Sequence, residues 1–151
     1  MTPDDWRTFR EVRLAALQDA PYAFGSKYEW EIVKPEESWR TRLAARAQFL
    51  AELDGKPLGT AGGIASDDGN AALISMWVAP SARGQGVGDR LVGAVLDWAR
   101  SEGYPGIRLW VTEGNHAAEN LYRRCGFTRT GAEQPVSPDD PRTEFEMAAD
   151  L

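Results

Sequence analysis

The stretch Ser75-Met-Trp-Val-Ala-Pro-Ser-Ala-Arg-Gly-Gln-Gly-Val-Gly-Asp89 decides the fold of this chain. Its apolar first half predicts a buried strand, and its glycine-rich second half leads directly into an amphipathic helical pattern. Gly84, Gly86 and Gly88 clear side chains from the turn, so backbone N–H groups can approach a ligand closely. The helix N-terminus adds unpaired donors and the positive end of a dipole. The unit therefore predicts an anion site suited to a pyrophosphate, the alternative being a turn that merely needs glycine.

The glycine spacing excludes the two commonest phosphate loops. A dinucleotide-binding fingerprint requires G-x-G-x-x-G, and the place of its third glycine is taken by Asp89. A P-loop ends in Gly-Lys followed by Ser or Thr, whereas Gly88 is followed by Asp89 and Arg90. The spacing Arg83-x-x-Gly86-x-Gly88 instead resembles the acyl-coenzyme A loop of the GNAT superfamily of N-acetyltransferases.

A second stretch, Trp110 to Phe127, resembles the other signature of this superfamily. In that signature an Asn follows a strand end, and Ala-x-x-Leu-Tyr and Gly-Phe come after it. The matching residues are Asn115, Ala118, Leu121, Tyr122, Gly126 and Phe127. Asn115 and Tyr122 lie two helical turns apart, so both project from one face. In the family, the matching Asn contacts the pantetheine arm and the matching Tyr hydroxyl sits near the thioester sulfur.

The resemblance covers about residues 71–132 and implies one α/β domain over residues 1–151. A central mixed sheet would be flanked by helices. The family usually opens with a strand before its first helix. Here only Met1-Thr2 precedes the helix that Thr2-Pro3-Asp4 is expected to start, so the first strand is missing, very short or upstream.

Local patterns predict the remaining elements. Apolar periodicity and start and stop signals predict helices over 3–19, 24–33, 35–46, 87–102 and 115–125. Alternating or continuous apolar runs predict strands over 48–53, 58–66, 71–78, 107–111, 128–132 and 143–148. The Pro- and Asp-rich residues 133–142 are expected to form a loop.

Composition narrows the class of protein. The 151 residues are 42% hydrophobic and 26% charged, as in ordinary globular domains, and the net charge is −6. An acidic chain repels a phosphate backbone, so nucleic acid is not expected as a partner; acidity favours a cationic substrate or simply solubility. No apolar run approaches the roughly 18 residues of a membrane span, and no signal peptide is recognisable. The single Cys125 suits a reducing compartment, so a cytoplasmic protein is expected, and a homodimer is considered among its partners.

The resemblance implies acetyl transfer from acetyl-CoA to a primary amine of a small molecule, by direct attack in a ternary complex. A backbone N–H near Trp77 and Val78, freed by a β-bulge, would stabilise the oxyanion. The residues expected to contact acetyl-CoA are Trp77, Val78, Arg83, Gly84, Gln85, Gly86, Val87, Gly88, Asp89, Asn115, Ala118 and Tyr122. No His, Cys or Asp cluster has metal-ligand spacing, so no metal is expected.

Tyr122 is the expected proton donor to the leaving thiolate, whereas the base is harder to assign. Several family members carry a Glu on a central strand, but the strand ending at Val78 has no carboxylate and position 110 is Trp. The candidate bases are therefore Glu113, Glu29 and Glu31, directly or through a water chain. The residues expected to line the acceptor pocket are Phe24, Trp30, Glu31 and Trp110.

Two other functions stay open. One is an acetyltransferase for protein N-termini or lysines. An open groove between residues 20–34 and 133–142 would favour it, and a closed pocket would favour a small amine. The other is a CoA-binding regulatory module without catalysis. The lack of a carboxylate on the strand that ends at Val78 is compatible with such a module. The presence of both Asn115 and Tyr122 argues against it.

Overall fold

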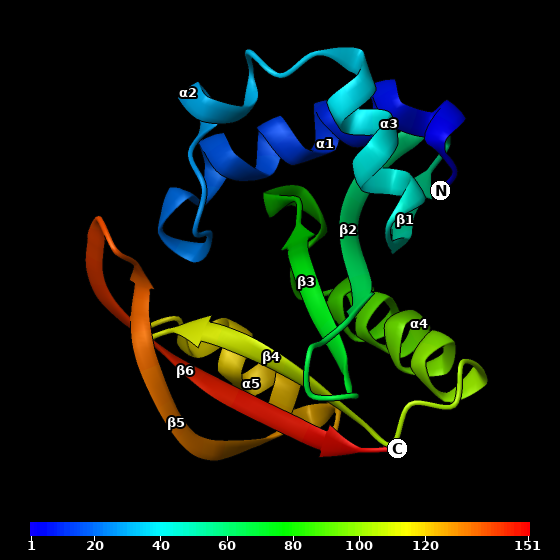
Figure 1. Cartoon of the computed structure of the whole chain (residues 1–151). Helices are drawn as coiled ribbons and strands as arrows, with labels where there is room; N and C mark the ends of the chain where they lie inside the picture. Colours follow the sequence, from blue (N-terminus) through cyan, green and yellow to red (C-terminus); the bar gives the residue numbers. More distant parts are fainter.

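Six strands form one mixed sheet in the computed structural model, which describes residues 1–151 (Figure 1). The strands are β1 Ala47–Leu53, β2 Lys56–Ala65, β3 Ala71–Val78, β4 Gly106–Thr112, β5 Thr128–Ser137 and β6 Asp140–Asp150. Across the sheet their order is β1-β2-β3-β4-β6-β5, and only β3 and β4 run parallel. The expected α/β fold with a central mixed sheet is confirmed, and no strand precedes the first helix.

Helices connect and cover these strands. The α-helices are α1 Trp6–Asp19, α2 Tyr28–Glu31, α3 Glu36–Ala44, α4 Val87–Ser101 and α5 His116–Arg124. Short 3₁₀ turns stand at η1 Pro3–Asp5, η2 Pro21–Ala23 and η3 Pro80–Ala82. No helix combines the length and the hydropathy that crossing a bilayer requires.

The helices α1 and α4 cover opposite faces of the sheet. Successive residues of a strand point to opposite faces. Phe49 packs against the core cluster that contains α4, whereas its neighbour Leu50 packs against the cluster that contains α1. Gly63 allows α4 to lie close to the sheet, because a Cβ there would stand 2.4 Å from the Trp98 ring.

The two parallel strands at the centre of the sheet separate along their length. Only Ala71 pairs with Ile107 and Ala72 with Arg108, after which β3 and β4 diverge (Figure 1). The facing edges of the two strands beyond these pairs make no ladder with each other. Their backbone groups are available to a ligand that enters between them.

A β-bulge interrupts β3 near its end. Thr60 pairs with Trp77 and Gly62 pairs with Ile74, so β3 contains one residue more than β2 between these two pairs. The extra residue falls at Ser75 or Met76, and Ser75 has a left-handed φ of 56°. The bulge therefore lies just before Trp77, slightly earlier than the sequence suggested.

Two expected elements are wrong. Residues 133–142 are not a loop, because β5 and β6 form a hairpin whose turn is at Pro138-Asp139. Pro135 is tolerated in β5, an edge strand that needs fewer backbone donors. The helix expected over 24–33 shrinks to α2, because Phe24 to Lys27 is extended or bent around Gly25.

Glu31, which the sequence placed in the acceptor pocket, lies in a buried ion-pair cluster instead. Its carboxylate accepts from Arg13 at 3.1 Å and from Arg42 at 2.8 Å, and its side chain is 2% exposed. Burial by itself raises the pKa of Glu31, but the hydrogen bonds and charges of the two arginines outweigh it and lower the pKa to about 2. Glu31 therefore joins α2 to α1 and α3.

Replacing Glu31→Gln is expected to destabilise the protein at pH 7 by about 3–5 kcal/mol, because two arginines lose their counter-charge. A lowered pKa makes this contribution complete above about pH 4.3, where an unfolded glutamate ionises, and lost as pH falls toward 2. Urea unfolding of variant and wild type should therefore differ less at pH 3 than at pH 7.

The exposed pair of Glu36 with Arg40 on α3 supplies the control. Glu36→Gln should cost less than about 1 kcal/mol, as exposed ion pairs do. Equal losses in the two variants would contradict a structural role of the Glu31 cluster.

Candidate functional site

One cavity of about 670 Å³ opens where β3 and β4 diverge. Five segments line it: 20–24 after α1, the end of β3, the loop before α4 with its first turn, the end of β4, and α5. The sequence-predicted residues that line it are Phe24, Trp77, Val78, Arg83, Gly84, Gly86, Val87, Gly88, Asp89, Trp110, Asn115, Ala118 and Tyr122. The fold thus brings both sequence motifs to one cavity.

The loop before α4 forms a cradle of unused backbone donors. The N–H groups of six consecutive residues, Gly84 to Asp89, donate to no group of the protein. Gly84 and Gly86 have left-handed φ values of 74° and 81°, and a Cβ on either would point into open space. Gly86 is also the N-cap of α4, so the cradle lies at the positive end of a 15-residue helix. This arrangement fits a pyrophosphate.

Gly88 has a different function in the same loop. A Cβ at Gly88 would stand 3.1 Å from the Leu121 side chain and 3.5 Å from Met76. Its missing side chain therefore lets α4 approach α5 and β3. Two of the three glycines thus shape the cradle, and the third allows the packing behind it.

The polar side chains of the loop contact protein groups. Arg83 donates from Nε to the Val78 carbonyl at 3.1 Å and pairs with Asp19. Gln85 donates to the Ser81 carbonyl at 3.1 Å and does not line the cavity. Asp89 pairs with Arg124 at 3.3 Å. The donors that the loop leaves without a protein partner are therefore its backbone N–H groups.

Asn115 and Tyr122 both face the cavity from α5. The Asn115 side chain caps the helix by accepting from the Ala118 N–H at 3.3 Å, which leaves its amide NH₂ free. Tyr122 is buried and packs edge-on against Phe127, with ring centroids 5.9 Å apart. Burial and the charge of Cys125, and no hydrogen bond, act on its hydroxyl within the chain. Burial, and secondarily the nearby Cys125, raise the pKa of Tyr122, so the hydroxyl stays protonated.

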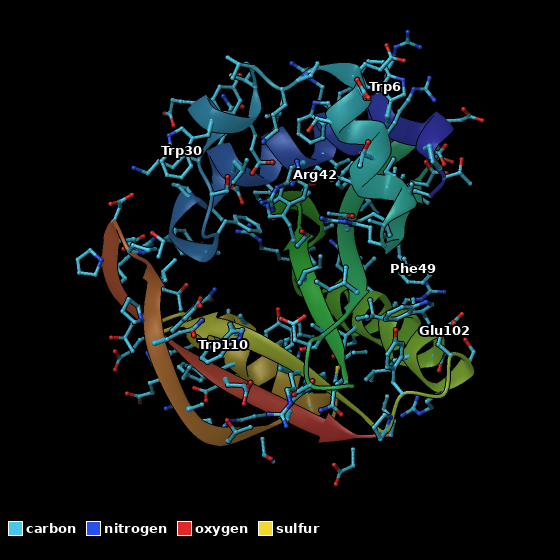
Figure 2. The ribbon with its side chains drawn as sticks, viewed as in Figure 1. Trp6, Trp30, Arg42, Phe49, Glu102 and Trp110 are labelled. Carbon is cyan, nitrogen blue, oxygen red and sulfur yellow. The ribbon has the colours of Figure 1, made fainter.

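The structure does not bring the candidate bases into this cavity. Glu29 is exposed and lines a second cavity, as does Trp30; Glu113 is exposed at the end of β4 and lines neither. Trp30 and Trp110 stand on separate elements, α2 and β4 (Figure 2). The only carboxylate that lines the first cavity is Asp89.

The second cavity, of about 750 Å³, lies between residues 17–30 and 137–142. Tyr22 and Phe24 line both cavities and so form their common wall. Sequence reasoning named Phe24 and missed Tyr22. The sequence does contain an indication for Tyr22. This residue precedes Phe24 by two positions, in the same segment that an Ala-Pro break separates from α1.

Comparisons with known proteins agree with the fold. The sequence model described as the acetyltransferase (GNAT) family matches residues 6–127. A relative named "Probable N-acetyltransferase camello", from Xenopus tropicalis, is 34% identical over 102 residues, which are 66% of this chain and 47% of the relative. The chain spans about half the length of the curated relatives that it matches first.

Solved structures share the whole fold. A ribosomal-protein-alanine N-acetyltransferase from Brucella melitensis superposes with a TM-score of 0.81 at 21% identity, over 100% of this chain and 97% of that one. An acetyltransferase from Salmonella typhimurium, solved with its cofactor acetyl-CoA, superposes with a TM-score of 0.78 at 21% identity, over 100% and 91%. With the family model covering most of its length, this chain belongs to the acetyltransferase (GNAT) family.

Proposed function

We propose that this chain transfers an acetyl group from acetyl-CoA to a primary amine of a small molecule. The observation that carries the proposal is that one cavity is lined both by Tyr122 and by five of the six residues whose unused N–H groups lie at the N-terminus of α4. These N–H groups suit the pyrophosphate of CoA, and the Tyr122 hydroxyl suits its sulfur. When bound, acetyl-CoA would supply an activated thioester.

The donor would lie along the gap between β3 and β4. The N–H groups of Gly84 to Asp89 would hold the pyrophosphate. The free edges of the two strands and the Asn115 amide would hydrogen-bond the pantetheine arm. The bulge before Trp77 turns the local backbone out of its ladder register, which supports an N–H of Trp77 or Val78 as oxyanion donor.

The acceptor amine must be neutral to attack. A lysine-like amine has a pKa near 10.4, so roughly one molecule in 2,500 is neutral at pH 7, a cost of about 4–5 kcal/mol. Tyr22, Phe24 and Trp110 add aromatic surface to the lining of the cavity. Such surroundings favour the neutral amine by desolvation. We therefore assign deprotonation to desolvation and water, since Glu29 and Glu113 lie outside the cavity.

A peptide N-terminus is the second candidate acceptor. The second cavity adjoins the first across Tyr22 and Phe24, where the chain of a peptide could lie while its amine reaches the thioester. The similarity in fold to a ribosomal-protein-alanine N-acetyltransferase is consistent with that use. We rank it second because Tyr22 and Phe24 stand between the two cavities.

Thermal unfolding with acetyl-CoA, followed by assay of free-thiol release, tests the proposal. Acetyl-CoA at about 100 times its Kd should add ~2.7 kcal/mol and raise Tm by about 5–10 °C. Thiol release with small primary amines should then exceed release with peptides. Preference for peptides would establish the second candidate. Binding without turnover of either class would indicate a regulatory module, and absence of binding would overturn the proposal.

A further inference from the structure

One carboxylate oxygen at the end of α1 holds two residues that bound the donor side of the cavity. Asp19 Oδ2 accepts from the Trp77 indole Nε1–H at 3.0 Å and from Arg83 Nη2. Arg83 also donates from Nε to the Val78 carbonyl at 3.1 Å. The segment from Trp77 to Arg83 is therefore closed into a compact turn against a single atom of α1.

This segment connects the two functional ends of the donor site. Trp77 and Val78 carry the backbone proposed to stabilise the oxyanion, and Arg83 directly precedes the phosphate cradle. Between them stands only η3, which the Ala79 N–H anchors to the Leu58 carbonyl at 2.7 Å. A shift of Arg83 would displace the cradle relative to the oxyanion donor. The distance between these two sites must lie within the reach of the pantetheine arm that joins the pyrophosphate of CoA to its thioester.

Stability alone does not account for the contacts of Asp19. The Asp19 and Arg83 side chains are 26% and 47% exposed, and ion pairs of that kind contribute little to folding. Trp77 is 9% exposed, and its indole N–H has Asp19 as its partner. The Asp19 carboxylate also forms an ion pair with the Arg83 guanidinium. The first residue of the Arg-x-x-Gly-x-Gly motif thus braces the loop here.

We propose that Asp19 is a positioning residue for acetyl transfer, which fixes the phosphate cradle relative to the oxyanion donor through Arg83 and Trp77. The inference rests on the proposed function. Asp19 also directly precedes residues 20–24, the acceptor-side wall of the same cavity. One carboxylate therefore positions the donor loop relative to the first residues of the acceptor-side wall.

Three substitutions separate positioning from charge. Asp19→Ala removes both contacts, Asp19→Asn keeps an acceptor for Trp77 without the charge, and Asp19→Glu keeps the charge one methylene away. Asp97→Asn is the matched control, because it removes an exposed ion pair with Arg100 on the outer side of α4. Each variant is assayed for the Kd of CoA by calorimetry, for kcat with the best amine, and for Tm.

Positioning predicts that Asp19→Ala weakens CoA binding and lowers kcat, each by roughly tenfold to a hundredfold. Asp19→Glu should lose nearly as much, Asp19→Asn should be intermediate, and Asp97→Asn should match wild type. If Asp19 acted only through its charge, Asp19→Glu would match wild type and the neutral variants would bind CoA more tightly, which overturns the inference. A lower Tm with unchanged Kd and kcat overturns it too. Wild type without turnover of any amine would instead contradict the proposed function, and the Kd series would still test the bracing of the cradle.

Discussion

Gly86→Glu is expected to weaken the binding of acetyl-CoA by more than about 100-fold. Gly86 has φ of 81°, where a side chain costs about 1–2 kcal/mol. The new carboxylate would stand among the unused N–H groups of the cradle and compete for them. It would also repel the pyrophosphate, and like charges in contact cost several kcal/mol in binding. About 2.8 kcal/mol is enough for a hundredfold loss.

Gly55→Glu is the matched control for this substitution. Gly55 has a similar φ of 76°, and a Cβ there also meets no atom within 4 Å, but it stands in the β1–β2 hairpin turn, outside both cavities. Both variants should lose similar stability, whereas only Gly86→Glu should lose binding by isothermal calorimetry. Normal affinity in a folded Gly86→Glu protein would remove the loop from the donor site.

Features that depend on local chemistry could be predicted from the sequence. The backbone cradle before α4 needs left-handed glycines, and Gly84 and Gly86 supply them at the positions that the sequence indicated. The same holds for Asn115, whose cap position follows from its place before the helical pattern. The strand–loop–helix unit and α5 therefore stand where the sequence placed them.

Features that depend on contacts between distant segments could not be predicted from the sequence. Glu31 has the sequence context of a surface acid, and only the packing of α1, α2 and α3 brings two arginines to it. The strand character of residues 133–142 likewise comes from pairing, since Gln134 and Pro135 join a ladder with Glu144 and Thr143. At a sheet edge the partner strand supplies the order that propensity does not.

The divergence of β3 and β4 is another feature that could not be predicted from the sequence. Nothing in either strand's own sequence states that pairing stops after Ala72 and Arg108. The cavity, and with it the choice among candidate acceptor residues, was therefore outside the reach of the sequence. Glu29 and Trp30 line the second cavity and not the first.

Tyr122→Phe is expected to lower kcat by about 10²-fold or more while the Kd of acetyl-CoA stays within about twofold. The substitution removes only the hydroxyl, and no hydrogen bond acts on that hydroxyl within the chain. Ring packing against Phe127 remains, so Tm should be unchanged. A separate binding measurement with acetyl-CoA distinguishes loss of chemistry from loss of affinity.

Tyr104→Phe supplies the matched control. Tyr104 is half-buried, packs beside Trp98 with ring centroids 5.5 Å apart, and lies beyond the end of α4. Losing its hydroxyl should leave kcat unchanged. A Tyr122→Phe enzyme with the kcat of wild type on a good amine would exclude Tyr122 from the reaction.

The direction of the Tyr122 pKa shift determines what kind of acid it can be. An unperturbed phenol has a pKa near 10, and the thiol formed from the leaving thiolate has a pKa near 8.5. Full transfer of the proton from the phenol to the thiolate therefore costs roughly 2 kcal/mol. Burial raises the pKa of Tyr122 and makes full transfer harder still. A hydroxyl that donates a hydrogen bond to the sulfur, and passes on a proton released by the amine, avoids that cost. Wild-type kcat should therefore show no alkaline loss from Tyr122 below about pH 10, because the raised pKa keeps the phenol protonated there.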